Sequence, residues 1–145
     1  MLANKFAADG VLLEPNSLQL GLQLYELLAF WLCNRAHVEN GYVLFCITLP
    51  IHISSAVTGP VPMEFAVVPE HFIEDMIEIV VFASRLALRI NDKNLMDVRF
   101  ARDSLRAVPL VNVMKFAVVM MDNMEFLKNP HLRARLVDVC SSMCD

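Results

Sequence analysis

Apolar residues recur with the period of an α-helix over most of this chain, and polar residues form only narrow stripes between them. The pattern predicts five helices, at about residues 17–36, 70–90, 95–107, 109–127 and 130–143. In the first of them, the polar positions Gln19, Gln23 and Glu26 form a single stripe. A helix that is apolar over so much of its circumference is buried on more than one side. The helices are therefore expected to pack against several neighbours each.

Local signals mark where three of these helices begin. Asn16 or Ser17 is expected to cap the first helix, because a short polar side chain can accept an unpaired N–H of the first turn. Pro69 opens the second helix. Asn129 and Pro130 form a complete start for the last one, since Asn is a capping residue and proline suits the first helical position.

Consecutive long helices with narrow polar stripes predict an all-α fold of stacked antiparallel helices, as in an armadillo-like α-solenoid. Each helix pair in such a fold buries its apolar face only by leaning on its neighbours. No repeat of fixed period accompanies the pattern. An irregular closed helical bundle is therefore the alternative architecture.

The stretch between the first two helices is the hardest to interpret. Asn40 and Gly41 mark a turn, residues 42–49 fit a strand or a helix, and residues 51–62 read as an irregular linker. Residues 41–63 carry no Asp, Glu, Lys or Arg and are long enough to span a membrane. Prolines interrupt this run repeatedly, and a spanning segment must satisfy its own backbone. A membrane protein is therefore the least favoured reading.

Composition narrows the possible classes of function. The 145 residues are enough for one domain, and 57% of them are hydrophobic while 19% are charged. Such an apolar chain is not disordered, and its faces are expected to be covered by a larger assembly. The net charge of −4 and the lack of a basic cluster exclude an electrostatic footprint for nucleic acid.

The residues that usually carry chemistry do not form a recognisable motif. Cys140 and Cys144 lie four apart, on one helical face and not at zinc-knuckle spacing, so the cysteines are interpreted as small hydrophobic residues in a reduced compartment. Glu70, Glu74 and Asp75 are interpreted as solvated acids near a helix start and not as acid–base groups. We therefore predict no catalytic residue, no cofactor-binding or metal-binding residue, and no cofactor.

Two segments carry a more specific signal. VPEHFIED at residues 68–75 has the form (L/V)-P-E-(F/H)-x-x-(E/D)-(D/N), and NPHLRARLVDV at residues 129–139 has the form N-P-(H/Y)-L-x-A-(K/R)-L-x-(E/D)-V. In these segments the chain resembles the core of the ubiquitin-chain-elongating factors, the large ubiquitin ligases that end in a U-box. Lys128 and the run His131-Leu132-Arg133 resemble the metazoan A-type branch. Both segments contain the capping and proline residues that begin a helix, so we interpret their role as structural and not as that of a binding or catalytic site.

The resemblance covers about residues 63–140 firmly and residues 7–37 weakly. In the weaker stretch Val11 and Glu14 replace an aromatic residue and an asparagine of a D-G-F-(M/L)-L-N pattern. Residues 38–60 match no family segment. The resemblance implies an armadillo-like solenoid. It also implies extension of polyubiquitin chains, for proteasomal degradation, on substrates that already carry ubiquitin, in the cytoplasm and nucleus.

The partners that the resemblance implies are the ubiquitin-conjugating enzyme, ubiquitylated substrates and the hexameric AAA segregase. In this family the U-box recruits the charged conjugating enzyme through surface contacts and supplies no covalent nucleophile. No U-box is expected within the 145 residues, so residues 1–145 are interpreted as a single segment of the core that acts as a scaffold. The alternative is a non-enzymatic helical adaptor of the ubiquitin pathway. Whether the chain belongs to an active transferase or to a short form stays open.

Overall fold

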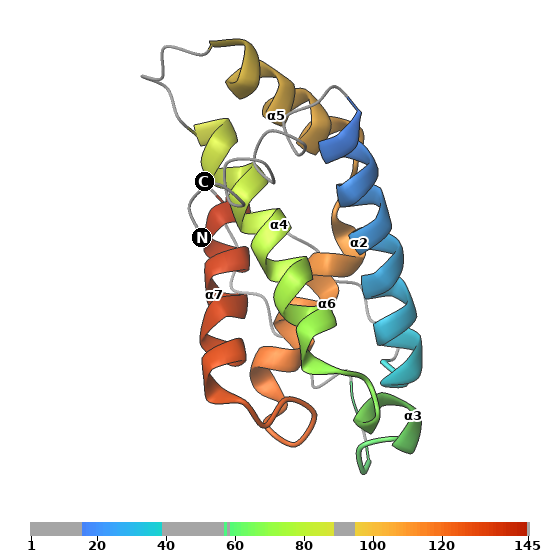
Figure 1. Cartoon of the computed structure of the whole chain (residues 1–145). Helices are drawn as coiled ribbons and strands as arrows, with labels where there is room; N and C mark the ends of the chain where they lie inside the picture. The colour runs from blue at the N-terminus through green and yellow to red at the C-terminus, as the bar shows by residue number, and fades with distance from the viewer. Residues whose placement is uncertain (1–15, 39–56, 58, 89–94, 145) are drawn as a thin grey trace, which may run out of the picture.

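A computed structural model describes residues 16–38, 57, 59–88 and 95–144, with the backbone only for residues 95–98 and 144. These residues form six helices and no strand, which confirms the all-α prediction (Figure 1). The helices are α2 (Ser17–Arg35), α3 (Met63–Ala66), α4 (Glu70–Leu88), α5 (Leu95–Ala107), α6 (Val111–Asp122) and α7 (Pro130–Cys144).

Helices α4 and α7 lie side by side and run in the same direction (Figure 1). Three contacts join residues that follow the same order along both helices: Glu70 with Asn129, Glu78 with Arg135, and Ser84 with Met143. Helix α6 precedes α7 and runs antiparallel to it, and α2 packs on α6. Helix α7 thus packs in parallel on α4, the third helix before it in the chain. This arrangement fits the predicted solenoid, in which successive helical units stack on one another.

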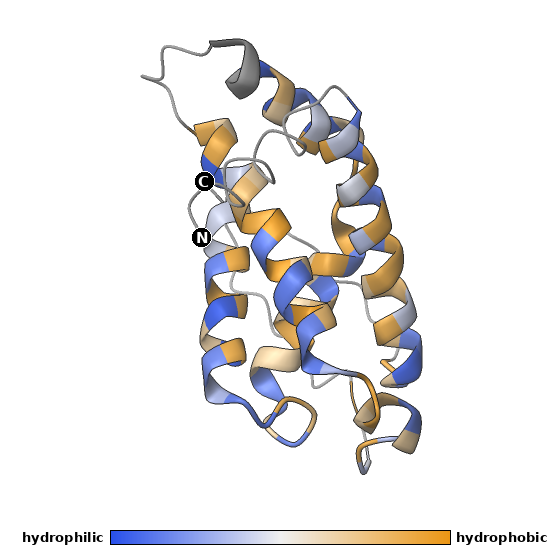
Figure 2. Ribbon diagram, in the orientation of Figure 1, coloured by the Kyte–Doolittle hydropathy of each residue, from blue (hydrophilic) through white to orange (hydrophobic). Residues whose placement is uncertain are grey.

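One cluster of buried hydrophobic residues joins the helices. Figure 2 shows hydrophobic and hydrophilic residues alternating along the helices that form it. Phe116 of α6 is fully buried, and α4 buries residues along most of its length, from Ile73 to Ala87. Helix α4 contacts α2, α5 and α7, so the expectation that it is buried on more than one side is confirmed. Arg102 of α5 donates from Nε to the carbonyl oxygen of Ala87 at 2.8 Å and so satisfies the last turn of α4.

Helix α6 is shorter than predicted, since the pattern indicated residues 109–127 and the helix spans Val111–Asp122. Its end is set by Asn123, which leaves the helical conformation at φ −109° and ψ 88°. The Asn123 side-chain amide donates to the carbonyl oxygen of Val119 at 2.7 Å, satisfying a carbonyl of the last turn. The chain then turns and buries Phe126 against Phe65 of α3. The apolar residues after Asp122 therefore belong to a loop that packs on the core, and they do not extend the helix.

Helix α2 departs from the sequence prediction in two ways. Asn16 occupies the N-cap position at φ 78°, and its side chain makes no capping hydrogen bond, so the predicted cap is wrong for this residue. The helix buries only one side, formed by Leu18, Leu22, Ala29, Leu32 and Cys33. Its opposite side is exposed, which contradicts the expectation that this helix is covered on several sides.

The predictions for residues 38–56 fall outside the described residues, apart from Val38. Residues 59–62 are extended or bent as expected for a linker, and the short helix α3 follows them. Within the part of the chain that the structure describes, no single helix combines the length and the apolar character needed to cross a membrane. The pair Arg99–Ala107 and Val111–Asp122, bent by 82°, meets that test by length and composition alone.

Candidate functional site

The two segments singled out in the sequence meet in space. The side-chain amide of Asn129 donates from Nδ2 to Oε2 of Glu70 at 3.1 Å. The Oδ1 atom of Asn129 accepts the backbone N–H of His131 at 3.0 Å, and its carbonyl oxygen accepts the N–H of Arg133 at 3.2 Å. Asn129 therefore caps α7, as its sequence position predicts, and at the same time ties the start of α7 to the start of α4.

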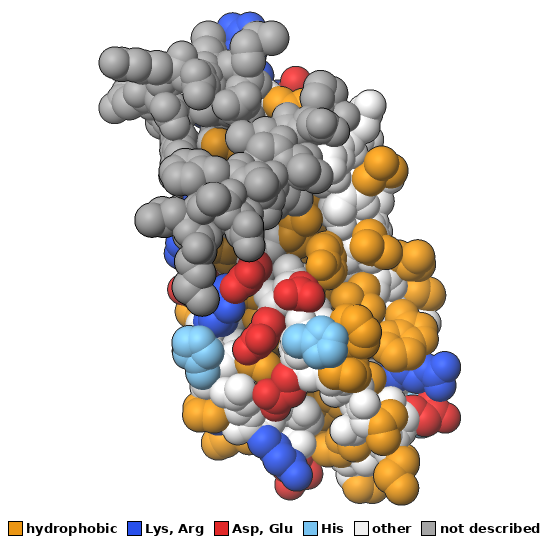
Figure 3. Space-filling model, viewed as in Figure 1, with side chains coloured by type: hydrophobic (Ala, Val, Ile, Leu, Met, Phe, Trp, Pro, Cys, Tyr) orange, Lys and Arg blue, Asp and Glu red, His pale blue; other side chains and the backbone are white. Residues whose placement is uncertain are grey.

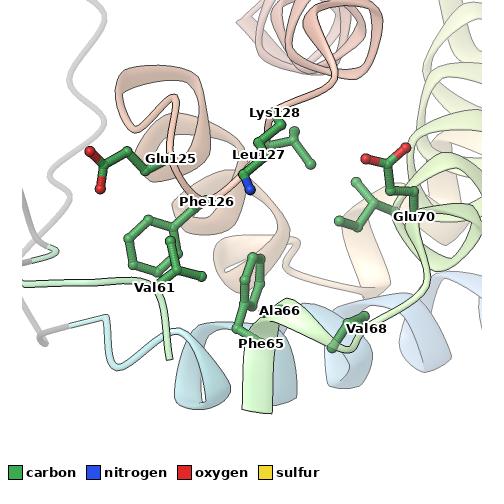
Figure 4. Close-up of a pocket in the computed structure, with 10 residues that line it drawn as sticks. Val61, Phe65, Ala66, Val68, Glu70, Glu125, Phe126, Leu127 and Lys128 are labelled. Atoms are coloured by element: carbon green, nitrogen blue, oxygen red, sulfur yellow. The ribbon is translucent and has the colours of Figure 1, made fainter. Parts of the chain in front are cut away.

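A cavity of about 200 Å³ lies beside this junction, between α3, the start of α4 and the turn that precedes α7. Figure 4 shows Phe65, Phe126 and Val61 gathered on its wall, with Glu70 and Glu125 at opposite ends. The ring of Phe65 lies 5.6 Å from that of Phe126 and 6.5 Å from that of Phe116, measured between centroids. These distances are typical of tilted aromatic pairs that hold a loop onto a core.

A second junction joins α2 to the start of α6. The carboxylate of Glu26 accepts three hydrogen bonds at 2.7 to 3.1 Å: from the backbone N–H and side-chain Nδ2 of Asn112, and from the backbone N–H of Val113. A carboxylate at this place satisfies otherwise unpaired N–H groups and faces the positive end of the α6 dipole. The sequence analysis places Glu26 in a polar stripe and does not predict its contact with α6. A single acidic residue in an otherwise apolar helix is nevertheless a signal, because a carboxylate in such surroundings needs hydrogen-bond partners.

Exposed ion pairs support the same packing weakly. Arg35 of α2 contacts Glu64 of α3 at 2.7 Å, and its guanidinium carbon lies 5.4 Å from the centre of the Trp31 ring. Arg135 of α7 contacts Glu78 of α4 at 3.4 Å. Pairs this exposed contribute little to stability, because water and salt screen them.

Burial raises the pKa of two side chains of α2. It raises the pKa of the Cys33 thiol from 9.0 to about 11, while the charge of Lys115 opposes this rise and that of Glu26 adds to it. Burial, with the negative charges of Asp75 and Glu78, also raises the pKa of Tyr25. Cys33 is therefore a neutral thiol at physiological pH, which suits a core residue and not a nucleophile.

The histidines, the remaining cysteines and the acids near the start of α4 form no catalytic motif in the part of the chain that the structure describes. His37 ends the turn after α2, while His71 and His131 are exposed near the starts of α4 and α7; His52, Cys46 and the Cys144 side chain fall outside the description. Of the three acids near the start of α4, Glu70 bonds to Asn129, and Asp75 is exposed. Among the described residues no three His, Cys, Asp or Glu side chains are grouped so that they could hold a metal ion.

The fold and both junctions thus define a scaffold of stacked helices, in which polar side chains position one helix on another. The sequence model of the ubiquitin elongating factor core matches residues 1–144, and the chain belongs to this family. The chain is similar to the probable ubiquitin conjugation factor E4 of Arabidopsis thaliana, at 32% identity over 129 residues. That match covers 89% of this chain and 10% of the relative. No solved structure gives a significant match.

These comparisons confirm the resemblance and widen it. The family match includes residues 7–37, where the sequence resemblance is weak. Its bounds also enclose residues 38–60, for which the sequence analysis names no matching segment. The two segments at residues 68–75 and 129–139 are recognisable alone because capping and proline positions tolerate few residue types. Apolar segments accept many substitutions of similar volume and are harder to recognise.

Proposed function

We propose that this chain is a scaffold portion of a ubiquitin–ubiquitin ligase, which extends polyubiquitin chains on substrates destined for proteasomal degradation. The observation that carries the proposal is the family match over residues 1–144. The relative's printed name, a ubiquitin conjugation factor, points to the same class of activity. The chain spans about a tenth of that relative, so transfer itself is assigned to the longer polypeptide. In this proposal the polypeptide acts in the cytoplasm and nucleus.

The geometry supports a role in positioning partners. Helices α4 and α7 are joined by polar contacts at their starts and along their length, and a continuous core backs them. Stacked helices of this kind form extended surfaces on which partners can bind. The proposed partners are ubiquitylated substrates, the hexameric AAA segregase, and a ubiquitin-conjugating enzyme recruited by a U-box elsewhere in the polypeptide.

The test is chain elongation by the polypeptide that carries these residues, captured from cells through an added epitope tag. The captured protein is mixed with ubiquitin-activating enzyme, conjugating enzyme and a substrate that carries one ubiquitin. We expect longer chains than in a mock capture. Leu132→Asp places a charge at a fully buried site of α7 and should abolish elongation, whereas Val137→Asp, at a site 54% exposed on the same helix, should preserve it.

Two results would overturn this proposal. If the captured wild-type protein binds the ubiquitylated substrate without lengthening its chain, the adaptor reading is correct and the ligase reading is wrong. If the Leu132→Asp and Val137→Asp variants both elongate chains as fast as the wild type, this segment plays no part in the activity.

A further inference from the structure

The cavity between α3, the start of α4 and the turn before α7 has room for little more than one large side chain. Its volume is about 200 Å³, whereas pockets that hold small molecules or cofactors usually enclose about 300–1,000 Å³. Apolar groups of Val61, Phe65 and Phe126 form much of its wall (Figure 4). Pockets that receive a single anchoring side chain are typical of contacts between proteins. The size of the cavity therefore favours a protein segment as its ligand.

Exposed apolar residues adjoin the lining of this cavity in the sequence. Val67 follows the lining residue Ala66. Met124 precedes the lining residue Glu125. Met63, Val67 and Met124 are 62 to 79% exposed, and Figure 3 shows apolar side chains gathered at the end of the molecule where α3 lies. Methionine side chains adapt to the shape of a partner, and exposed apolar patches mark interaction sites.

The charges of the lining indicate the charge of the ligand. Glu70 and Glu125 lie at opposite ends of the cavity, and both are exposed (Figure 4). One carboxylate oxygen of Glu70 accepts the side-chain amide of Asn129 at 3.1 Å, and the other can accept a further hydrogen bond. Lys128 supplies one positive charge against these two negative charges, so the lining as a whole is negative. An apolar side chain with a cationic residue on each side is complementary to this arrangement.

We propose that this cavity binds an extended segment of another protein, in which one large apolar side chain is flanked on both sides by Lys or Arg. The apolar side chain enters the cavity beside Phe65 and Phe126, and the two cationic groups pair with Glu70 and Glu125. Burial of the apolar side chain supplies most of the affinity, whereas the exposed carboxylates select the charge of the segment. This inference does not depend on the proposed ligase activity, because a segment can be bound without any transfer of ubiquitin.

The test measures the binding of three synthetic peptides to the epitope-tagged polypeptide that cells make. The probe is the peptide Gly-Ser-Lys-Phe-Lys-Ser-Gly with an uncharged fluorescent dye. The second peptide has Ala in place of Phe, and the third has Glu in place of both Lys residues. Fluorescence anisotropy gives the three dissociation constants. We expect the Lys-Phe-Lys peptide to bind at least tenfold more tightly than either of the others, because one lacks the apolar side chain and the other carries the wrong charge.

Matched variants at exposed sites locate the binding. Glu125→Lys reverses the charge at one end of the cavity and should weaken binding of the Lys-Phe-Lys peptide at least fivefold, whereas Asp138→Lys on α7 should weaken it less than twofold. Ala66→Phe places a ring in the lining and should weaken binding at least tenfold, whereas Ala134→Phe on α7 should leave it within twofold. All four residues are exposed, so these changes leave the core intact.

Several results would overturn the proposal. A Lys-Phe-Lys peptide that does not bind at about 1 mM would show that the cavity takes no such segment. Equal binding of the Phe and Ala peptides would mean that charge alone attracts them, and tighter binding of the Glu peptide would mean that Lys128 selects the ligand. Equal binding by all four variants would place the peptide elsewhere on the polypeptide. A dimer of the polypeptide that Ala66→Phe converts to monomers would make a second copy the occupant.

Discussion

Asn129 joins two helix starts with one side-chain amide, which donates to Glu70 at 3.1 Å and accepts the N–H of His131 at 3.0 Å. Glu70 and Asn129 are 59 residues apart in the sequence. The first belongs to the start of α4 and the second to the start of α7, so a local capping device also sets the relative position of two parallel helices.

Replacement of Asn129 separates these two roles. Asn129→Ala removes both the cap and the contact with Glu70, and should lower the free energy of unfolding by about 1 kcal/mol or more. Asn129→Ser keeps a capping oxygen but cannot reach Glu70, and should cost clearly less than Asn129→Ala. Urea denaturation of the three proteins measures this. Equal losses for Ala and Ser would show that the cap contributes nothing.

Removal of the Glu26 carboxylate should be more damaging. Glu26→Ala leaves the N–H groups of Asn112 and Val113 without their acceptor in a half-buried site, which costs roughly 1–3 kcal/mol. Glu26→Gln keeps one acceptor oxygen and should cost less. Glu78→Ala, which removes an exposed partner of Arg135, should cost less than about 1 kcal/mol. Thermal unfolding ranks these variants, and a loss for Glu78→Ala as large as that for Glu26→Ala would contradict the assignment.

Gly21 marks the close approach of α2 to α4. A Cβ atom added there would lie 2.7 Å from Cδ1 of Ile79, so Gly21→Ala gains helix propensity but forces this side chain to move. We expect little or no net stabilisation from Gly21→Ala alone. In an Ile79→Val background, which lacks Cδ1, the same change should stabilise by up to about 1 kcal/mol. A double-mutant cycle in urea measures this coupling, and additive effects would refute it.

Cys33 should make stability fall at alkaline pH. Burial holds the pKa of its thiol at about 11 in the folded state, against 9.0 for the unfolded chain. The unfolded state therefore loses its proton first as pH rises, and stability falls between about pH 9 and 11. Cys33→Ala lowers stability at pH 8 because it leaves a cavity, but that deficit should shrink by pH 10.5. A deficit that is the same at both pH values would contradict the burial of a neutral thiol.

Much of the secondary structure follows from sequence alone. The last helix was predicted at residues 130–143 and spans Pro130–Cys144, and the predicted 95–107 helix matches α5. The prediction for α6 was too long at both ends. At its start the helix is capped by the carboxylate of Glu26 from α2, and after its end Asn123 bonds back to Val119 while Phe126 packs on Phe65. Periodicity alone does not reveal these contacts. The prediction of no catalytic, cofactor-binding or metal-binding residue stays a prediction.

The sequence by itself determined the longer helices, the starts of α4, α5 and α7, and the family, because helical periodicity and capping depend on residues within about four positions of one another. Only the tertiary structure decided that Glu26 caps α6, which begins 85 residues later, and that Asn129 contacts Glu70. It also decided which apolar side of α2 is buried, since both sides carry similar residues. The hydrophobic effect has no direction, so the choice between two equally apolar sides belongs to the packing of the neighbouring helices.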